Sequence, residues 1–155
     1  MRLNGSVSKY CRLALQCLLP ALALPAVAAH APARVPTQKY ACSVGKEPHE
    51  MRFIIELAKE KPVFFALWTA NRGYRCSVHA THGDVYSRWS ESGGHTVIKM
   101  VDDMGTVTIG GAKGRYQIKF DDINKMRFCG MEGEMSGTVT LTRGHRECGW
   151  EGEPL

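Results

Sequence analysis

The stretch that decides the fold is Lys125–Trp150, with the sequence KMRFCGMEGEMSGTVTLTRGHRECGW. Its β-prone residues fall into two runs, Met126–Cys129 and Thr138–Thr142, and glycines stand where the chain has to reverse. A cysteine closes the first run and another, Cys148, follows the second. The pattern predicts an antiparallel strand pair whose ends are joined by a local disulfide.

Upstream of this stretch, short β-prone runs recur at spacings of about 8–12 residues, separated by Gly-rich or acidic reversals. No amphipathic stretch is long enough for the helical crossover that parallel strands need. The chain is therefore predicted to be all-β, a single small antiparallel meander of about nine or ten strands, closed as a barrel or stacked as a sandwich.

Two runs leave alternatives open. His49–Leu57 places Met51, Phe53, Ile55 and Leu57 at every second position, which favours a strand, although Pro48 before it also allows a helix. We take the strand as the prediction. Val63–Thr69 is apolar on both faces, as in a strand that is covered on both sides or one that exposes a binding face.

The first 29 residues have the three parts of a secretory signal peptide. Residues 1–12 carry three basic residues and no acid, residues 13–29 are almost wholly apolar, and small residues end the run. We expect cleavage after Ala28 or Ala29, a flexible leader over residues 30–38 and a single β-rich domain over residues 39–155. The sequence thus predicts a periplasmic or secreted protein with no stable membrane insertion after cleavage.

Loss of the signal peptide changes the charge and the cysteine count. The net charge falls from +5 to +2, because 17 basic residues remain against 15 acidic ones, so a nucleic-acid partner is not indicated. Four cysteines remain, and in an oxidising compartment they predict two disulfides. Three connectivities are open, and we favour the two local pairs, Cys42–Cys76 and Cys129–Cys148.

Only weak patterns suggest metal binding or catalysis. His79 and His82 follow Cys76 at ligand-like spacing, and Asp84 lies close by, but strand periodicity would point the two histidines to opposite faces. Glu132 and Glu134 are two residues apart and have no partner base in the sequence pattern. We predict no catalytic group and no cofactor, and keep His79 and His82 only as weak metal candidates.

Basic and aromatic residues in and beside the turns are the candidates for a protein- or glycan-binding face. They are Arg72, Tyr74, Arg88, Trp89, Lys113 and Arg115. The loops expected to make the contacts are Asn71–Gly73, Glu91–His95 and Gly110–Gly114. The alternative is that these residues are simply the solvent-facing side chains of a β-sheet.

The opening Tyr40-x-Cys42-x-x-Gly45, in a small exported β-protein, is similar to the opening of the periplasmic inhibitors of C-type lysozyme. The resemblance implies a β-barrel that binds a hydrolase. The inhibitory Ser-Gly-x-x-Tyr loop of those proteins is not matched, because Ser92-Gly93-Gly94-His95-Thr96 lacks the tyrosine. We infer no membership of that family from this resemblance.

The function predicted from the sequence is an exported, disulfide-stapled, non-enzymatic β-domain. It would bind a protein or an envelope component, for example as an inhibitor of a hydrolase such as lysozyme. One alternative is a small envelope enzyme or metal-binding protein that uses His79 and His82. Another is a structural envelope protein without a discrete ligand. The sequence gives neither the identity of the partner nor the oligomeric state.

Overall fold

The computed structural model describes residues 36–46, 49–71 and 74–152, without the side chains of Asn71 and Tyr74. These residues belong to one compact unit, Arg34–Leu155. The predicted signal peptide and most of the predicted leader lie outside the described residues. The first strand begins at Thr37, two residues before the predicted start of the β-rich domain.

The chain is nearly all β, as predicted. The ten strands of its described part are β1 (Thr37–Lys46), β2 (His49–Ala58), β3 (Lys61–Asn71), β4 (Tyr74–Thr81), β5 (Ser87–Ser92), β6 (His95–Met100), β7 (Thr106–Ala112), β8 (Arg115–Asn124), β9 (Glu134–Thr142) and β10 (Gly149–Gly152). A 3-10 turn, η1 (Val101–Asp103), and one short α-helix, α1 (Lys125–Cys129), interrupt them. In the part of the chain that is described, no helix has the length and hydropathy needed to cross a membrane.

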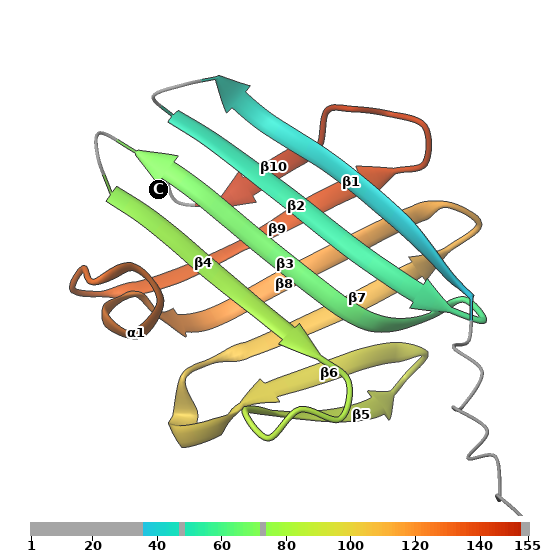
Figure 1. The fold of residues 1–155 in the computed structure, drawn as a ribbon, viewed down its shortest axis with the longest axis horizontal. Helices are drawn as coiled ribbons and strands as arrows, with labels where there is room; N and C mark the ends of the chain where they lie inside the picture. The colour runs from blue at the N-terminus through green and yellow to red at the C-terminus, as the bar shows by residue number, and fades with distance from the viewer. Residues whose placement is uncertain (1–35, 47–48, 72–73, 153–155) are drawn as a thin grey trace, which may run out of the picture. The chain divides into compact units, whose positions relative to one another are not determined.

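The strands form two antiparallel meanders (Figure 1). Strands β1 to β4 make a four-stranded sheet in sequence order, and β5 to β10 make a six-stranded sheet, also in sequence order. The chain changes sheet once, between β4 and β5, and the strands of one sheet cross those of the other. Within the described residues the ladder does not close into a barrel, so the observed arrangement is two packed sheets.

The two sheets share one apolar core. In β2, Met51, Phe53, Ile55 and Leu57 are buried while the residues between them are half-buried or exposed, which confirms the strand prediction for this segment. Phe120 on β8 is fully buried. Its ring meets Phe53 and Phe65 of the other sheet edge-on, with centroids 6.3 and 6.2 Å apart.

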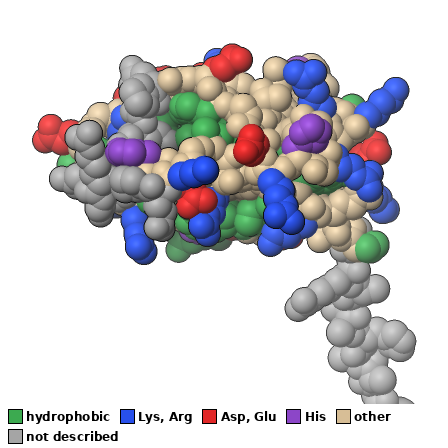
Figure 2. Space-filling view, turned by 90° about the horizontal axis from the view of Figure 1, so that it is seen from above, with side chains coloured by type: hydrophobic (Ala, Val, Ile, Leu, Met, Phe, Trp, Pro, Cys, Tyr) green, Lys and Arg blue, Asp and Glu red, His purple; other side chains and the backbone are tan. Residues whose placement is uncertain are grey.

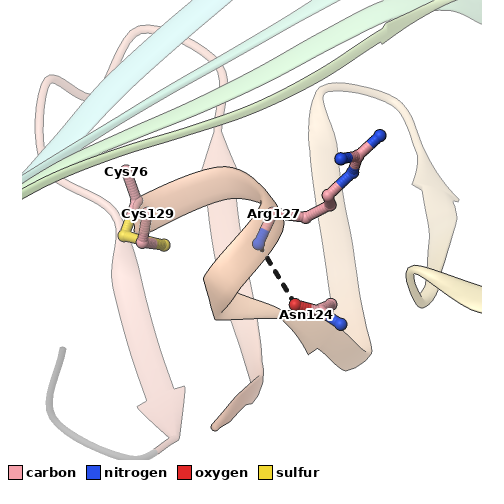
Figure 3. The surroundings of a disulfide bond; sticks show 4 residues. All are labelled: Cys76, Asn124, Arg127 and Cys129. Atoms are coloured by element: carbon pink, nitrogen blue, oxygen red, sulfur yellow. Dashed lines mark hydrogen bonds between the residues drawn. A yellow bond between two sulfur atoms is a disulfide. The ribbon is translucent and has the colours of Figure 1, made fainter. Parts of the chain in front are cut away.

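The predicted strand at Met126–Cys129 is wrong, because this segment forms α1. Asn124 caps the helix by accepting a hydrogen bond from the Arg127 backbone N–H through its side chain, at 3.1 Å (Figure 3). Gly130 ends the helix in the left-handed conformation at φ 67°. These two local signals flank only five residues and outweigh the modest β-propensity of the residues between them.

The predicted disulfide pairing is also wrong. The bonds are Cys42–Cys148 and Cys76–Cys129, with Cα atoms 5.4 and 4.2 Å apart. Cys42 and Cys76 lie on the two edge strands of the four-stranded sheet, β1 and β4. Strands are spaced ~4.8 Å apart, so two intervening strands hold these cysteines far beyond bonding reach.

Each observed disulfide instead ties an edge of the four-stranded sheet to the C-terminal half of the chain. Cys42–Cys148 joins β1 to the segment before β10, and Cys76–Cys129 joins β4 to α1. The bonds span 106 and 53 residues. Loop closure of that length stabilises the fold by about 4–5 kcal/mol per bond on the chain-entropy model, more than the local pairs would have given.

Candidate functional site

The outer face of the four-stranded sheet carries an apolar strip that includes an exposed tryptophan. Trp68 on β3 is 39% exposed, and it points away from the core because its neighbour Leu67 is fully buried. Ile54 on β2 and Phe64 on β3 share this outer face and are half-buried. The apolar run of residues 63–69 is therefore a strand that exposes a face, one of the two outcomes that its sequence allowed.

Two hollows flank Trp68 on this face, and Glu50, Arg52 and Trp68 line both of them. The hollow toward β1 has a volume of about 670 Å³ and also includes Ile54. The hollow toward β4 has a volume of about 450 Å³ and also includes Phe128 of α1. The indole thus stands between two concave areas that an incoming side chain could fill.

An ion pair fixes the polar part of the face. Arg52 donates from Nε and Nη2 to the two carboxylate oxygens of Glu50, each at 2.9 Å. This hydrogen bonding lowers the pKa of Glu50 below its ordinary value, against a smaller opposing effect of desolvation, and the positive charge of Arg52 lowers it further. The bidentate pair orients the guanidinium beside Trp68, its cross-strand neighbour.

The disulfides hold the walls of the two hollows. On the β1 side, Ser43 donates its N–H to the Arg146 carbonyl at 2.8 Å and accepts from the Cys148 N–H at 2.9 Å. On the β4 side, Cys76–Cys129 fixes α1 against the edge strand (Figure 3). Both walls are therefore covalently anchored before any partner arrives.

The predicted binding residues do not gather in one place. Arg72 and the side chain of Tyr74 lie outside the described part of the structure. Arg88 is exposed on the outer side of β5, whereas Trp89 is half-buried on its inner side and donates from Nε1 to Ser87 Oγ at 2.9 Å.

Lys113 and Arg115 are exposed at the β7–β8 turn, remote in the sheet order from the edge strand β5. Two of the three predicted contact loops do meet. The β5–β6 and β7–β8 turns lie at the same end of the six-stranded sheet, and the His95 ring packs against Gly110 with no room for a Cβ there. The third, Asn71–Gly73, lies outside the described residues except for Asn71, and β3, which leads into it, ends at the left of Figure 1, whereas the other two turns lie at the right.

The β9–β10 turn joins this end of the molecule and forms a basic slot with β1. Its backbone is held by a 2.6 Å hydrogen bond from Arg143 N to Gly114 O. Between Gln38–Ala41 and Leu141–Arg146 lies a hollow of about 440 Å³, whose ionisable lining residues include Lys39, Arg143, His145 and Arg146 and no Asp or Glu. Figure 2 shows the molecule from above, with Lys and Arg side chains spread over this view and several of them at its right-hand end.

Sequence reasoning missed both the Trp68 face and the basic slot. The slot brings together residues about a hundred positions apart, and the only local signal was the basic turn Arg143-Gly144-His145-Arg146. The face had a stronger signal, an apolar run on both sides of a strand, but periodicity does not say which of the two sides is covered.

The histidines and glutamates considered for metal binding or catalysis are exposed side chains in the described structure. His79 is exposed on β4, while the His82 ring packs edge-on against Trp89 with centroids 5.5 Å apart. Glu132 and Glu134 are exposed. Among the described residues, no three His, Cys, Asp or Glu side chains are grouped in a way that could hold a metal ion.

Asp84 organises the connection between the two sheets. Its carboxylate accepts hydrogen bonds from the backbone N–H of Thr81 at 2.7 Å, the backbone N–H of Tyr86 at 3.0 Å and Ser87 Oγ at 2.7 Å. Burial by itself raises the pKa of Asp84, but the hydrogen bonds from Ser87 and the backbone outweigh it and leave the pKa below its ordinary value. This carboxylate stabilises the turn that carries the chain from β4 to β5.

Comparisons with known proteins give no family for this chain. A scan against family models finds no match, and neither does a search of curated proteins or of solved structures.

Proposed function

We propose that this chain is an exported, non-enzymatic β-domain that binds a protein or another envelope component through the outer face of β1 to β4. The observation that carries this proposal is Trp68, a large exposed aromatic on the sheet face, between two hollows and beside Arg52, which makes a bidentate pair with Glu50. Tryptophan and arginine are among the residues that contribute most to protein interfaces.

The rigidity of the face supports the same function. Trp68 stands on a strand that is hydrogen-bonded on both sides, and the inner side of the sheet is the core. The walls of the hollows are tied by disulfides, so little conformational entropy is lost on binding. The two disulfides also fit an oxidising compartment, and with the signal-like N-terminus they support a periplasmic or secreted location.

An inhibitor of a hydrolase is the most specific form of this proposal. The similarity of Tyr40-x-Cys42-x-x-Gly45 to the opening of the inhibitors of C-type lysozyme makes that enzyme the first purified probe. The measurement is the rate of cell-wall lysis by a C-type lysozyme with and without an equimolar amount of the mature chain. We expect slower lysis, and an unchanged rate removes this enzyme as the partner.

The general proposal is tested with a matched pair of aromatic variants. Immobilised wild-type chain, Trp68→Ala and Tyr86→Ala are incubated with envelope extract, and a retained protein is then purified and titrated against each variant. Tyr86 is 71% exposed on the β4–β5 connection, away from the outer face of the sheet, so it controls for the loss of any exposed ring. We expect Trp68→Ala alone to weaken binding of the purified partner, by at least about 2 kcal/mol. Equal affinity of the partner for the wild-type chain and for Trp68→Ala would show that the outer face of β1 to β4 is not the binding surface.

A further inference from the structure

The edges of the two sheets are not equally protected. Strand β10 has four residues and β5 has six, and β4 is tied to α1 by Cys76–Cys129. Strand β1 has ten residues, and Ser43 is the one position along its outer edge that pairs in the described structure, through a parallel bridge to Glu147. The stretch Thr37–Ala41 therefore presents an open edge of the kind that recruits additional strands.

The open stretch directs backbone groups outward. Ser43 uses its N–H and its C=O to bind the segment Arg146–Cys148, so both groups point away from β2. In an antiparallel ladder every second residue points the same way, which gives Lys39 and Ala41 the same orientation as Ser43. Among residues 36–46, 49–71 and 74–152, no backbone group pairs with Lys39 or Ala41 on that side.

The basic slot lies along this open edge. Gln38–Ala41 forms one wall and Leu141–Arg146 the other, with a hollow of about 440 Å³ between them. The Lys39 ammonium lies 4.0 Å from the Glu56 carboxylate, and the Lys39 side chain is largely exposed. The positive charge of the slot disfavours a second copy of this chain as its occupant. Pairing of two β1 strands would bring Lys39 and the basic turn close to the same positive groups of the other copy.

We propose that an extended, acidic segment of a partner protein adds to the edge of β1 in this slot. Its backbone pairs with the N–H and C=O of Lys39 and Ala41 and continues the pairing that Ser43 already makes with Glu147. Its carboxylates face Arg143, His145 and Arg146. Main-chain hydrogen bonds supply the affinity in this mode of recognition, and the side-chain contacts supply the selectivity. The proposal does not depend on binding at Trp68.

In the test, the mature chain is titrated with a seven-residue peptide in which Glu and Val alternate. The amide signals of the chain are monitored by NMR during the titration. We expect the amide signals of Lys39 and Ala41 to move, their exchange with solvent to slow, and binding to weaken as salt is raised. A peptide with Lys in place of every Glu should not bind. A peptide N-methylated on alternate residues loses its donors and should also fail, without any change to the protein.

Two variants at position 41 separate the contribution of the backbone N–H to peptide binding from that of the side chain. Ala41→Pro removes the outward N–H, which an edge strand tolerates, while Ala41→Thr keeps it. We expect Ala41→Pro to lower affinity about tenfold and Ala41→Thr to stay close to wild type. Should Ala41→Pro fail to fold, Arg143→Glu combined with Arg146→Glu replaces it, and loss of binding is again expected.

Three results would overturn the inference: equal binding of the acidic and the basic peptide, equal binding of the N-methylated peptide, or dimerisation of the chain through β1 without peptide. Loss of peptide binding in Trp68→Ala, with the signals of Lys39 and Ala41 unmoved, would place the peptide on the other face and would also reject it. Failure of the Trp68 proposal alone would leave the effects at Lys39 and Ala41 intact.

Discussion

The two sheets present different outer faces to solvent. On the six-stranded sheet the outward positions of β8 are Arg115, Gln117 and Lys119, and Lys119 pairs with Asp121 at 2.6 Å. On the four-stranded sheet the corresponding positions of β3 are Phe64, Ala66 and Trp68.

An antiparallel sheet with one face in water is ordinarily polar on that face, as the six-stranded sheet is. The four-stranded sheet departs from this rule along β3 and at Ile54 of β2, and its edges carry the two covalently fixed walls. The difference teaches that the apolar strip is not needed for the core, which the inner face already completes. The binding proposed above would account for an apolar strip at the surface.

The largest expected change in the free energy of unfolding comes from removing a disulfide that anchors a wall of the hollows. Replacing Cys76 and Cys129 together by Ser should lower the free energy of unfolding by about 4 kcal/mol, since the bond closes a loop of 53 residues. Replacing Cys42 and Cys148 should cost somewhat more, because that loop spans 106 residues. Denaturant titration measures both, and non-reducing peptide mapping checks the pairing. A Cys42–Cys76 peptide in the wild-type digest would contradict the structure.

The contact between the sheets comes next. Phe120→Ala should lower the free energy of unfolding by about 3–4 kcal/mol, because the ring is fully buried between the sheets. Its neighbour Lys119 points outward and is the matched control. Lys119→Ala is expected to stay within about 0.5 kcal/mol of wild type in the same titration. Similar costs for the two variants would mean that β8 is not oriented as described.

The junction between the sheets should show a pH dependence. Asp84→Asn removes the charge that the Thr81, Tyr86 and Ser87 donors stabilise, at a cost of about 1–2 kcal/mol near neutral pH. Because folding lowers the pKa of Asp84, its contribution is complete above the unfolded-state pKa and is lost as the pH falls through the folded-state value. Thermal unfolding from pH 7 to pH 2 should therefore show the variant and wild type converging at the acid end. A difference in Tm between the variant and wild type that stays constant from pH 7 to pH 2 would contradict this role of Asp84.

The last pair of variants should change stability least, and it compares the outer faces of the two sheets most directly. Ser77→Lys inserts a charge into the hollow beside Trp68, and Thr108→Lys inserts the same charge into the outer face of the six-stranded sheet. Both should change the free energy of unfolding by no more than about 0.5 kcal/mol. We expect Ser77→Lys alone to abolish binding of a purified partner in calorimetry. Equal binding of the partner by both variants would contradict the proposal that it binds the outer face of the four-stranded sheet.

Local periodicity was enough to predict the strands but not their long-range partners. The alternation in residues 49–57 predicted β2 because a half-buried strand shows which side is apolar. Periodicity alone does not detect the caps at Asn124 and Gly130, so it predicts a strand where α1 forms. The disulfide pairing followed from the order of strands in the sheet, which sequence spacing does not contain.

The candidate site was less predictable than the fold. Arg88 and Trp89 are neighbours in the sequence and were grouped together, but a strand sends them to opposite faces. The basic slot depends on β1 lying beside the β9–β10 turn, a contact between distant segments. Spacing along one sequence indicates a site of this kind only when both of its halves lie in one hairpin.

The most direct test of the binding face is hydroxyl-radical footprinting of the mature chain with and without envelope extract, analysed residue by residue by mass spectrometry. The extent of oxidation at Trp68 is compared with that at Tyr86, since both rings are exposed in the free chain. Binding through the outer face of the four-stranded sheet predicts that oxidation of Trp68 falls while that of Tyr86 is unchanged. Protection of Tyr86 with Trp68 still oxidised at its free rate would contradict it.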